Sequence, residues 1–247
     1  QPPPNGAVNG RFADGTGAYR TEDGWQFQDL AAGANRLCRH PAAESSGSPA
    51  LRAGPTFWLD RAVATVRSGK QRDGALVCTF WRYAADQGHA TRVDIALGSG
   101  VSVAPRAEHV SRDGKWLLLK DPGGSRWPYI LASLVDGTTR RLPTSSIHGT
   151  GEGVFFTPDT QYLLFLGSTC LRIWNLSDGA WEEDIRVPGA HGGRSYFGYS
   201  DRPSAAYAVS PGPPWRVVIR GVGERSQAYV LHTERQGAVA LPLPKKD

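Results

Sequence analysis

The sequence predicts an all-β protein built from repeated units of four short strands, and three observations support this. The chain has 247 residues, of which 30 are Gly and 18 are Pro, a composition that favours many strands joined by turns. Its hydrophobic fraction of 40% is enough to bury a sizeable core. Apolar segments and turn residues also recur in one order along the chain.

Two neighbouring segments share the same pattern most closely. Residues 110–143 read VSRDGKWLLLKDPGGSRWPYILASLVDGTTRRLP, and residues 155–188 read FFTPDTQYLLFLGSTCLRIWNLSDGAWEEDIRVP. Each segment has a turn near its start, then an aromatic residue followed by two leucines, and a second turn 23 or 19 residues after the first. Asp-Gly pairs at such turns supply the positive φ angles that tight hairpins require. Each segment is therefore expected to form four consecutive antiparallel strands.

The same order of strands and turns recurs three more times with greater variation. The five units are expected at residues 8–41, 61–105, 107–143, 153–188 and 204–244. The predicted first-turn residues are Gly15, Gly74, Gly114, Thr160 and Gly212, and the second-turn residues are Gly33, Gly98, Gly137, Gly179 and Gly237. Two longer segments, 42–60 and 189–203, remain as insertions between units.

A unit of four short strands has two apolar faces and cannot bury both of them alone. Stacking the units face to face around an axis solves this problem and leaves only short, protected sheet edges. The sequence therefore predicts a single β-propeller domain over residues 1–247 with five four-stranded blades. If the chain is a piece of a longer protein, the blades would form part of a six- or seven-bladed ring. An irregular β-sandwich or barrel is the alternative architecture.

Two strings carry a resemblance to a known family. SRDGKWLLL (Ser111–Leu119) and TPDTQYLLF (Thr157–Phe165) resemble the S-P-D-G-x-x-L-x-F signature of WD40-like propellers of the bacterial TolB type. The Gly-His and Trp-Asp dipeptides of strict WD40 repeats are absent, and Ile173-Trp174-Asn175 stands in place of the second. The resemblance implies a propeller fold, but it says little about function because propellers serve as enzymes, lectins and scaffolds.

The two insertions contain the candidate binding residues. Connections between blades leave from one face of a propeller, so both insertions are expected on the same rim. Exposed aromatic residues beside Gly and Arg are typical of recognition surfaces for a protein or a sugar. The alternative is that these aromatic residues fold back and seal the ring. The candidate contact residues are Phe57, Trp58, His191, Arg194, Tyr196, Phe197 and Tyr199.

Signals for catalysis, metals and cofactors are weak. The six His residues are isolated and form no zinc-binding or haem-attachment motif, so neither a metal nor a cofactor is predicted. Only Glu108 lies in the predicted innermost strands, whereas propeller glycosidases need paired carboxylates there. We therefore expect no catalytic residues and predict a non-catalytic binding or scaffold subunit of a larger protein assembly. The alternatives are a carbohydrate-binding propeller that uses the same aromatic residues and, with less support, a propeller hydrolase.

Charge, chain start and cysteines complete the expectations. The net charge of +5 is dispersed, so nucleic-acid binding is not predicted, and no apolar run reaches the roughly 20 residues of a membrane-spanning helix. The chain starts with Gln-Pro-Pro-Pro and contains no Met, which favours a periplasmic or extracellular protein whose leader has been removed. A cytoplasmic domain fragment is the alternative. Cys38, Cys78 and Cys170 leave at least one thiol unpaired, and a Cys38–Cys78 disulfide would require neighbouring units to abut.

Overall fold

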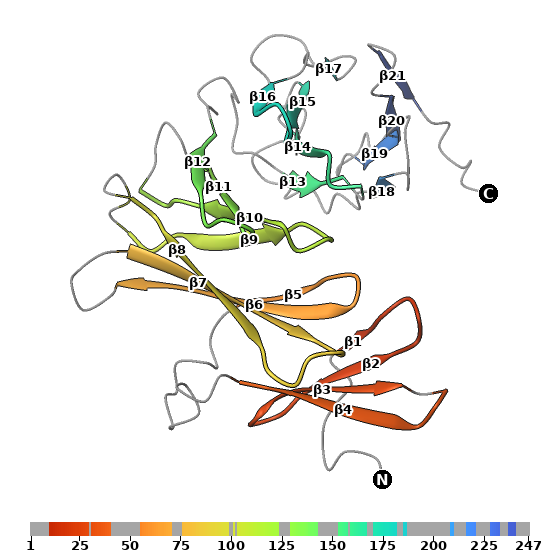
Figure 1. The fold of residues 1–247 in the computed structure, drawn as a ribbon. Coiled ribbons are helices and arrows are strands. Elements are labelled where there is room, and N and C mark those ends of the chain that lie inside the picture. The colour runs from red at the N-terminus through yellow and green to blue at the C-terminus, as the bar shows by residue number, and fades with distance from the viewer. Residues whose placement is uncertain are drawn as a thin grey trace. The chain divides into compact units, whose positions relative to one another are not determined.

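Every regular element that the computed structural model describes is a β-strand, which confirms the predicted all-β class (Figure 1). The described residues are 10–29, 31–40, 55–70, 76–98, 101, 103–123, 129–142, 153–157, 159–166, 170–181, 185–186, 208–209, 216–220, 228–232 and 237–240. The chain divides into two compact units, Gln1–Thr144 and Ser145–Asp247, which are described separately.

The first unit contains three four-stranded antiparallel sheets, each a meander of consecutive strands. Blade 1 consists of β1 (Gly10–Arg11), β2 (Gly17–Arg20), β3 (Gly24–Asp29) and β4 (Ala34–Arg39). Blade 2 consists of β5 (Thr56–Trp58), β6 (Ala62–Lys70), β7 (Leu76–Ala84) and β8 (Thr91–Ala96). Blade 3 consists of β9 (Arg106–Val110), β10 (Trp116–Lys120), β11 (Tyr129–Ser133) and β12 (Thr139–Arg141).

The second unit contains two further sheets with the same strand order. Blade 4 consists of β13 (Gly153–Phe156), β14 (Tyr162–Leu166), β15 (Cys170–Asn175), β16 (Ala180–Trp181) and β17 (Ile185–Arg186). Blade 5 consists of β18 (Ala208–Val209), β19 (Arg216–Arg220), β20 (Ala228–His232) and β21 (Gly237–Ala240). Both β16 and β17 pair with β15, and the register shifts by one residue between the two pairings. Both therefore lie along the same edge of β15, at the place of the fourth strand of the blade.

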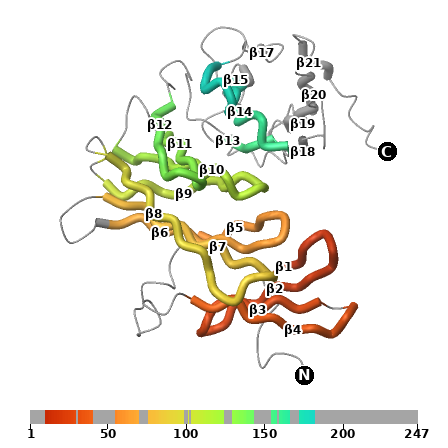
Figure 2. The backbone as a smooth tube through the Cα atoms, in the orientation of Figure 1, coloured from red at the N-terminus to blue at the C-terminus, as the bar shows by residue number. Residues whose placement is uncertain are grey.

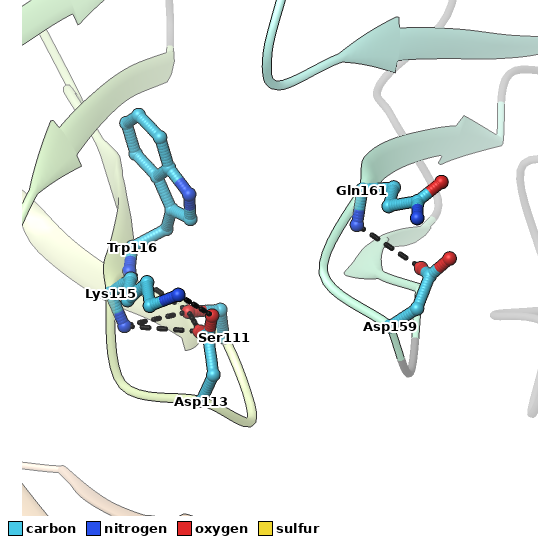
Figure 3. Close-up of polar contacts among 6 residues, drawn as sticks. All are labelled: Ser111, Asp113, Lys115, Trp116, Asp159 and Gln161. Carbon is cyan, nitrogen blue, oxygen red and sulfur yellow. Dashed lines mark hydrogen bonds and ion pairs between the residues drawn. The ribbon is translucent and has the colours of Figure 1, made fainter.

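The first turn of blades 3 and 4 explains the repeated sequence signature (Figure 3). In blade 3 the Ser111 hydroxyl donates to Asp113 Oδ1 at 2.7 Å and accepts a hydrogen bond from the Trp116 amide at 2.8 Å. In blade 4 the Thr157 hydroxyl donates to Asp159 Oδ1 at 2.6 Å. These side chains satisfy the backbone of their own turn, so the signature fixes a local structure.

The blades of the first unit stack face to face in chain order (Figures 1 and 2). Neighbouring side chains of β7 point to opposite faces of blade 2. Trp81 and Tyr83 join a buried cluster with Trp25 and Phe27 of blade 1. Phe80 joins a second cluster, which includes Leu117, Leu119 and Ile130 of blade 3. Blade 2 thus buries both of its faces against neighbouring sheets, as the blades of a β-propeller do, and the predicted class is confirmed.

The predicted bounds of blade 2 were wrong by one strand. The blade begins at Thr56 instead of residue 61, because β5 pairs with β6, and its last strand ends at Ala96. The Asp73-Gly74 pair therefore falls between the second and third strands, and Gly98 follows the blade. The first strand has only three residues, and its turn closes without glycine through a hydrogen bond from the Leu59 amide to the Ala62 carbonyl (2.9 Å). A search for turns that contain glycine does not detect such a hairpin.

Cys38 and Cys78 are buried free thiols. Cys38 lies in the cluster between blades 1 and 2, whereas Cys78 lies in the cluster between blades 2 and 3. A disulfide between them, which the sequence left open, is therefore not formed. Burial raises the pKa of the Cys78 thiol to about 11, because the thiolate would lose its hydration.

We expect Cys78 to resist alkylation by iodoacetamide at pH 8 in the folded protein and to react in denaturant. The thiolate is the reactive form, and the fold both shields it and raises its pKa. Since the unfolded thiol titrates near its ordinary value of 9.0, stability should fall as pH rises from there to about 11. Mass spectrometry of proteolytic peptides measures the label at Cys78. Equal labelling rates with and without denaturant would contradict the prediction.

Candidate functional site

The structure places two of the predicted contact residues and leaves the others untested. Phe57 and Trp58 lie in β5, not in an insertion between blades, so this part of the prediction was wrong. The chain enters blade 2 at the start of β5. The strand ends next to the first turn, which lies at the opposite end of the blade. Phe57 packs against the cluster between blades 2 and 3, whereas Trp58 is 37% exposed. The residues His191, Arg194, Tyr196, Phe197 and Tyr199 lie outside the described residues.

Trp58 is held in place by aromatic neighbours from blade 1. Its ring centroid lies 5.4 Å from that of Phe12 and 6.2 Å from that of Trp25, and both pairs meet edge to face. Gly10 allows this close approach, because a Cβ atom there would lie 2.2 Å from the indole ring. The partly exposed indole is therefore rigidly positioned between the first strands of two blades.

Charged side chains lie at the first turns of the three blades, and in blade 2 two of them follow Trp58 closely in the chain. Asp14 of blade 1 forms an ion pair with Arg61 of blade 2 at 3.7 Å. Asp60 of blade 2 forms an ion pair with Arg112 of blade 3, and the Asp60 amide also donates to the Arg112 carbonyl at 3.2 Å. Each pair links the first turns of neighbouring blades. We define the first-turn rim as Asp14, Trp58, Asp60, Arg61, Arg112, Asp113 and Lys115.

In two of the three ion pairs of the first-turn rim, the cation is more exposed than its carboxylate. The side chain of Arg61 is 83% exposed against 43% for Asp14, and that of Lys115 is 64% exposed against 32% for Asp113, 3.6 Å away. Arg112 and Asp60 are nearly equal, at 60% and 55%. Hydrogen bonds from Thr16 tether the Asp14 carboxylate to its own turn and lower its pKa. Arg61 is therefore the most exposed charged side chain of the rim.

An exposed valine lies beside the rim in blade 3. The Leu134 amide donates to the Lys115 carbonyl at 2.7 Å, which joins the turn after β11 to the first turn. Val135 follows and is 76% exposed. Next to it, hydrogen bonds from Thr138 and Ser133 lower the pKa of Asp136 to about 2, so this carboxylate is ionised. Apolar surface and a negative charge thus border the rim on this side.

Acidic residues are scarce in the first strands. Glu108 in β9 is the one carboxylate in the described residues of β1, β5, β9, β13 and β18, and it forms an ion pair with Arg106 at 3.6 Å. The described part of the chain brings together no group of three or more His, Cys, Asp or Glu side chains that could hold a metal ion. It also has no helix that could cross a membrane.

Sequence reasoning missed the arginines of the rim. Arg61 and Arg112 stand in the strings LDR and SRD, beside the first turns of consecutive blades. Aligning these strings would have required the correct bounds of blade 2. With those bounds, an Asp in the first turn of one blade is followed by an Arg at the first turn of the next blade. This order occurs twice and indicates a contact between the blades.

No family model and no curated protein matches this chain. Among solved structures, it is similar to the β-propeller domain of the Trilobed protease from Pyrococcus furiosus, with 11% identity and a TM-score of 0.43, covering 76% of this chain. It is also similar to the dihydro-heme d1 dehydrogenase NirN, with 17% identity and a TM-score of 0.47, covering 93% of this chain. The chain spans 57% and 45% of the length of those two chains.

Proposed function

We propose that this chain is a non-catalytic β-propeller subunit that binds a protein partner within a larger assembly. The observation that carries the proposal is the first-turn rim, where the exposed Trp58 indole is fixed between buried aromatic rings beside Arg61. Trp and Arg are the residue types that contribute most to the affinity of protein interfaces. A side chain that is already held in position loses less conformational entropy on binding.

The finer features of the fold belong to the same proposal. Five sheets of consecutive strands support a ring of five blades. The Ser/Thr-x-Asp turns at Ser111 and Thr157 support a relation to WD40-like propellers of the TolB type. Export from the cytoplasm stays a prediction.

A single carbohydrate site is the second candidate function. An exposed indole beside Asp14 and Arg61 offers a stacking surface with polar groups next to it, which suits a sugar ring. A lectin with one site in each blade would need an aromatic residue at the equivalent position of every blade. The first strands of blades 1 to 4 instead end in Arg11, Trp58, Val110 and Phe156.

Native purification followed by mass spectrometry of the co-eluting proteins tests the proposed function. We expect a stoichiometric protein partner, and we expect Trp58→Ala to reduce its recovery several-fold because the indole anchors the contact. Val103→Ala, which shortens an exposed side chain outside the first-turn rim, is the control. Elution as a lone 26.7 kDa monomer would contradict an obligate assembly.

The predicted contacts at Tyr196 and Phe197 have their own test. Replacing both residues by alanine is expected to weaken association with the same partner, since two aromatic anchors would be lost. Co-elution under native conditions measures the effect, and circular dichroism verifies that the variant is folded. Unchanged association in a folded variant would remove these residues from the proposed surface.

A further inference from the structure

We propose that the first-turn rim binds an acidic segment of a protein, which places a carboxylate on Arg61 and an apolar side chain against Trp58. This inference rests on the proposed function and names the chemistry of the partner. It is argued from the exposure of Arg61, from the first turns that carry its two arginines and from the exposed indole at the end of β5.

The high exposure of Arg61 compared with its carboxylate favours an acidic partner. Arg61 meets its carboxylate, Asp14, at 3.7 Å and is 83% exposed, so most of its donors remain available to a ligand. The Asp14 carboxylate, 43% exposed, accepts a hydrogen bond from the backbone amide of Thr16 at 3.0 Å, which ties it to its own turn. An approaching chain therefore meets the guanidinium first, and a guanidinium can bind a carboxylate through two parallel hydrogen bonds.

Two arginines belong to the first turns of neighbouring blades. Arg61 follows Asp60 in the chain, and Asp60 pairs with Arg112 of the next blade. The ion pair therefore joins the two turns that carry these guanidinium groups. A segment that crosses both turns can place one acidic residue at each guanidinium.

The indole adds a requirement that charge alone does not satisfy. Trp58 lies at the end of β5, directly before the turn that carries Asp60 and Arg61. Covering its exposed surface calls for an apolar or aromatic side chain next to the acidic residue. A nucleic acid fits less well, because its closely spaced phosphates would meet Asp14, Asp60 and Asp113 as well as the cations. Next to Val135 in blade 3, the ionised Asp136 would repel acidic residues of the partner.

The test compares the binding of four defined polymers to the full chain by fluorescence anisotropy. The probes are a glutamate–tyrosine copolymer, polyglutamate, polylysine and double-stranded DNA. We expect the copolymer to bind most tightly and its affinity to fall as salt is added. Arg61→Ala should weaken this binding roughly tenfold, the effect of losing an important interface arginine.

Matched variants identify the site. Arg92→Ala removes an arginine from another exposed ion pair, with Asp94 in β8, and should leave binding unchanged. Trp58→Phe retains an aromatic ring and should weaken binding of the copolymer but not of polyglutamate. Because Arg61 is highly exposed, its variant should unfold at the same urea concentration as the original protein.

Each contrary result overturns a distinct claim. Equal weakening by Arg61→Ala and Arg92→Ala, or equal binding of DNA and the copolymer, would show general attraction to polyanions and overturn the inference. If a stoichiometric partner is recovered equally with the original protein and with Arg61→Ala, the rim is not the site, although the proposed function survives. If no partner co-purifies and no acidic polymer binds, both proposals fail.

Discussion

Replacing Trp25 with alanine is expected to lower the free energy of unfolding by about 3–5 kcal/mol. Trp25 is 2% exposed and lies in the cluster between blades 1 and 2. Its ring centroid is 6.2 Å from that of Trp58 and 6.5 Å from that of Tyr83, so its removal leaves a cavity between the two sheets. Urea unfolding followed by far-ultraviolet circular dichroism measures the change. Native domains are stable by only about 5–15 kcal/mol, so the loss should be large in proportion.

Gln26→Ala is the matched control for this prediction. Gln26 is the next residue of β3, so its side chain lies on the opposite face of the blade, where it is only partly buried. Its truncation should change the free energy of unfolding by no more than about 0.5 kcal/mol. Equal losses for the two variants would mean that β3 does not present a single packed face to blade 2.

Gly24→Ala is expected to destabilise blade 1 by about 1–3 kcal/mol or more, although it adds only one methyl group. Gly24 has a φ of +152°, and a Cβ atom there would lie 2.1 Å from the Cys38 carbonyl oxygen. That oxygen belongs to the backbone of β4, which pairs with β3 at this point, so no change of rotamer can relieve the contact. The midpoint of urea unfolding reports the loss.

Gly69→Ala provides the comparison for the glycine variant. Gly69 lies in β6, where a Cβ atom would meet no other atom within 4 Å. Alanine there should leave the stability unchanged or raise it slightly, because it restricts the unfolded chain more than glycine does. If both glycine variants unfold at the same urea concentration, the close approach at Gly24 does not exist.

The parts of the fold that the sequence predicted well are those determined by local interactions. In blades 3 and 4, the hydroxyl and carboxylate side chains of the first turn bind their own backbone, so the signature and the turn coincide. Gly137 and Gly179 adopt positive φ angles at the second turns, as the pattern predicted. A short run of residues contains all the information that such elements need.

Blade 2 was misaligned because its first hairpin carries no local signal of this kind. Thr56–Trp58 is a three-residue strand after a Gly/Pro/Ser-rich segment, and its turn has Asp60 and Arg61 where blades 1, 3 and 4 have an Asp with Gly or Thr. The strand is recognised only through its pairing with β6. The sequence therefore indicated Trp58 as a candidate contact residue but assigned it to an insertion instead of a strand.

The candidate site depends on contacts between residues far apart in the chain. The ion pair between Asp60 and Arg112 joins residues 52 positions apart. The exposure of Trp58 depends on where Phe12 and Trp25 of another blade leave space for its ring. Single residue types in one sequence do not reveal such contacts, so the site emerges only when the blades are stacked.

The construction of every sheet from consecutive strands has a consequence for how the protein folds. Strands that are neighbours in the chain pair across short connections, so the hydrogen-bond ladders have low contact order and close with little loss of chain entropy. Each blade can form as soon as its own segment has left the ribosome, without waiting for a strand from the other end of the chain. Docking of a finished blade onto the preceding one, through clusters such as that of Trp25 and Tyr83, then becomes the non-local step. On this view, synthesis adds the blades one at a time, and the rate of assembly is set at the interfaces between them.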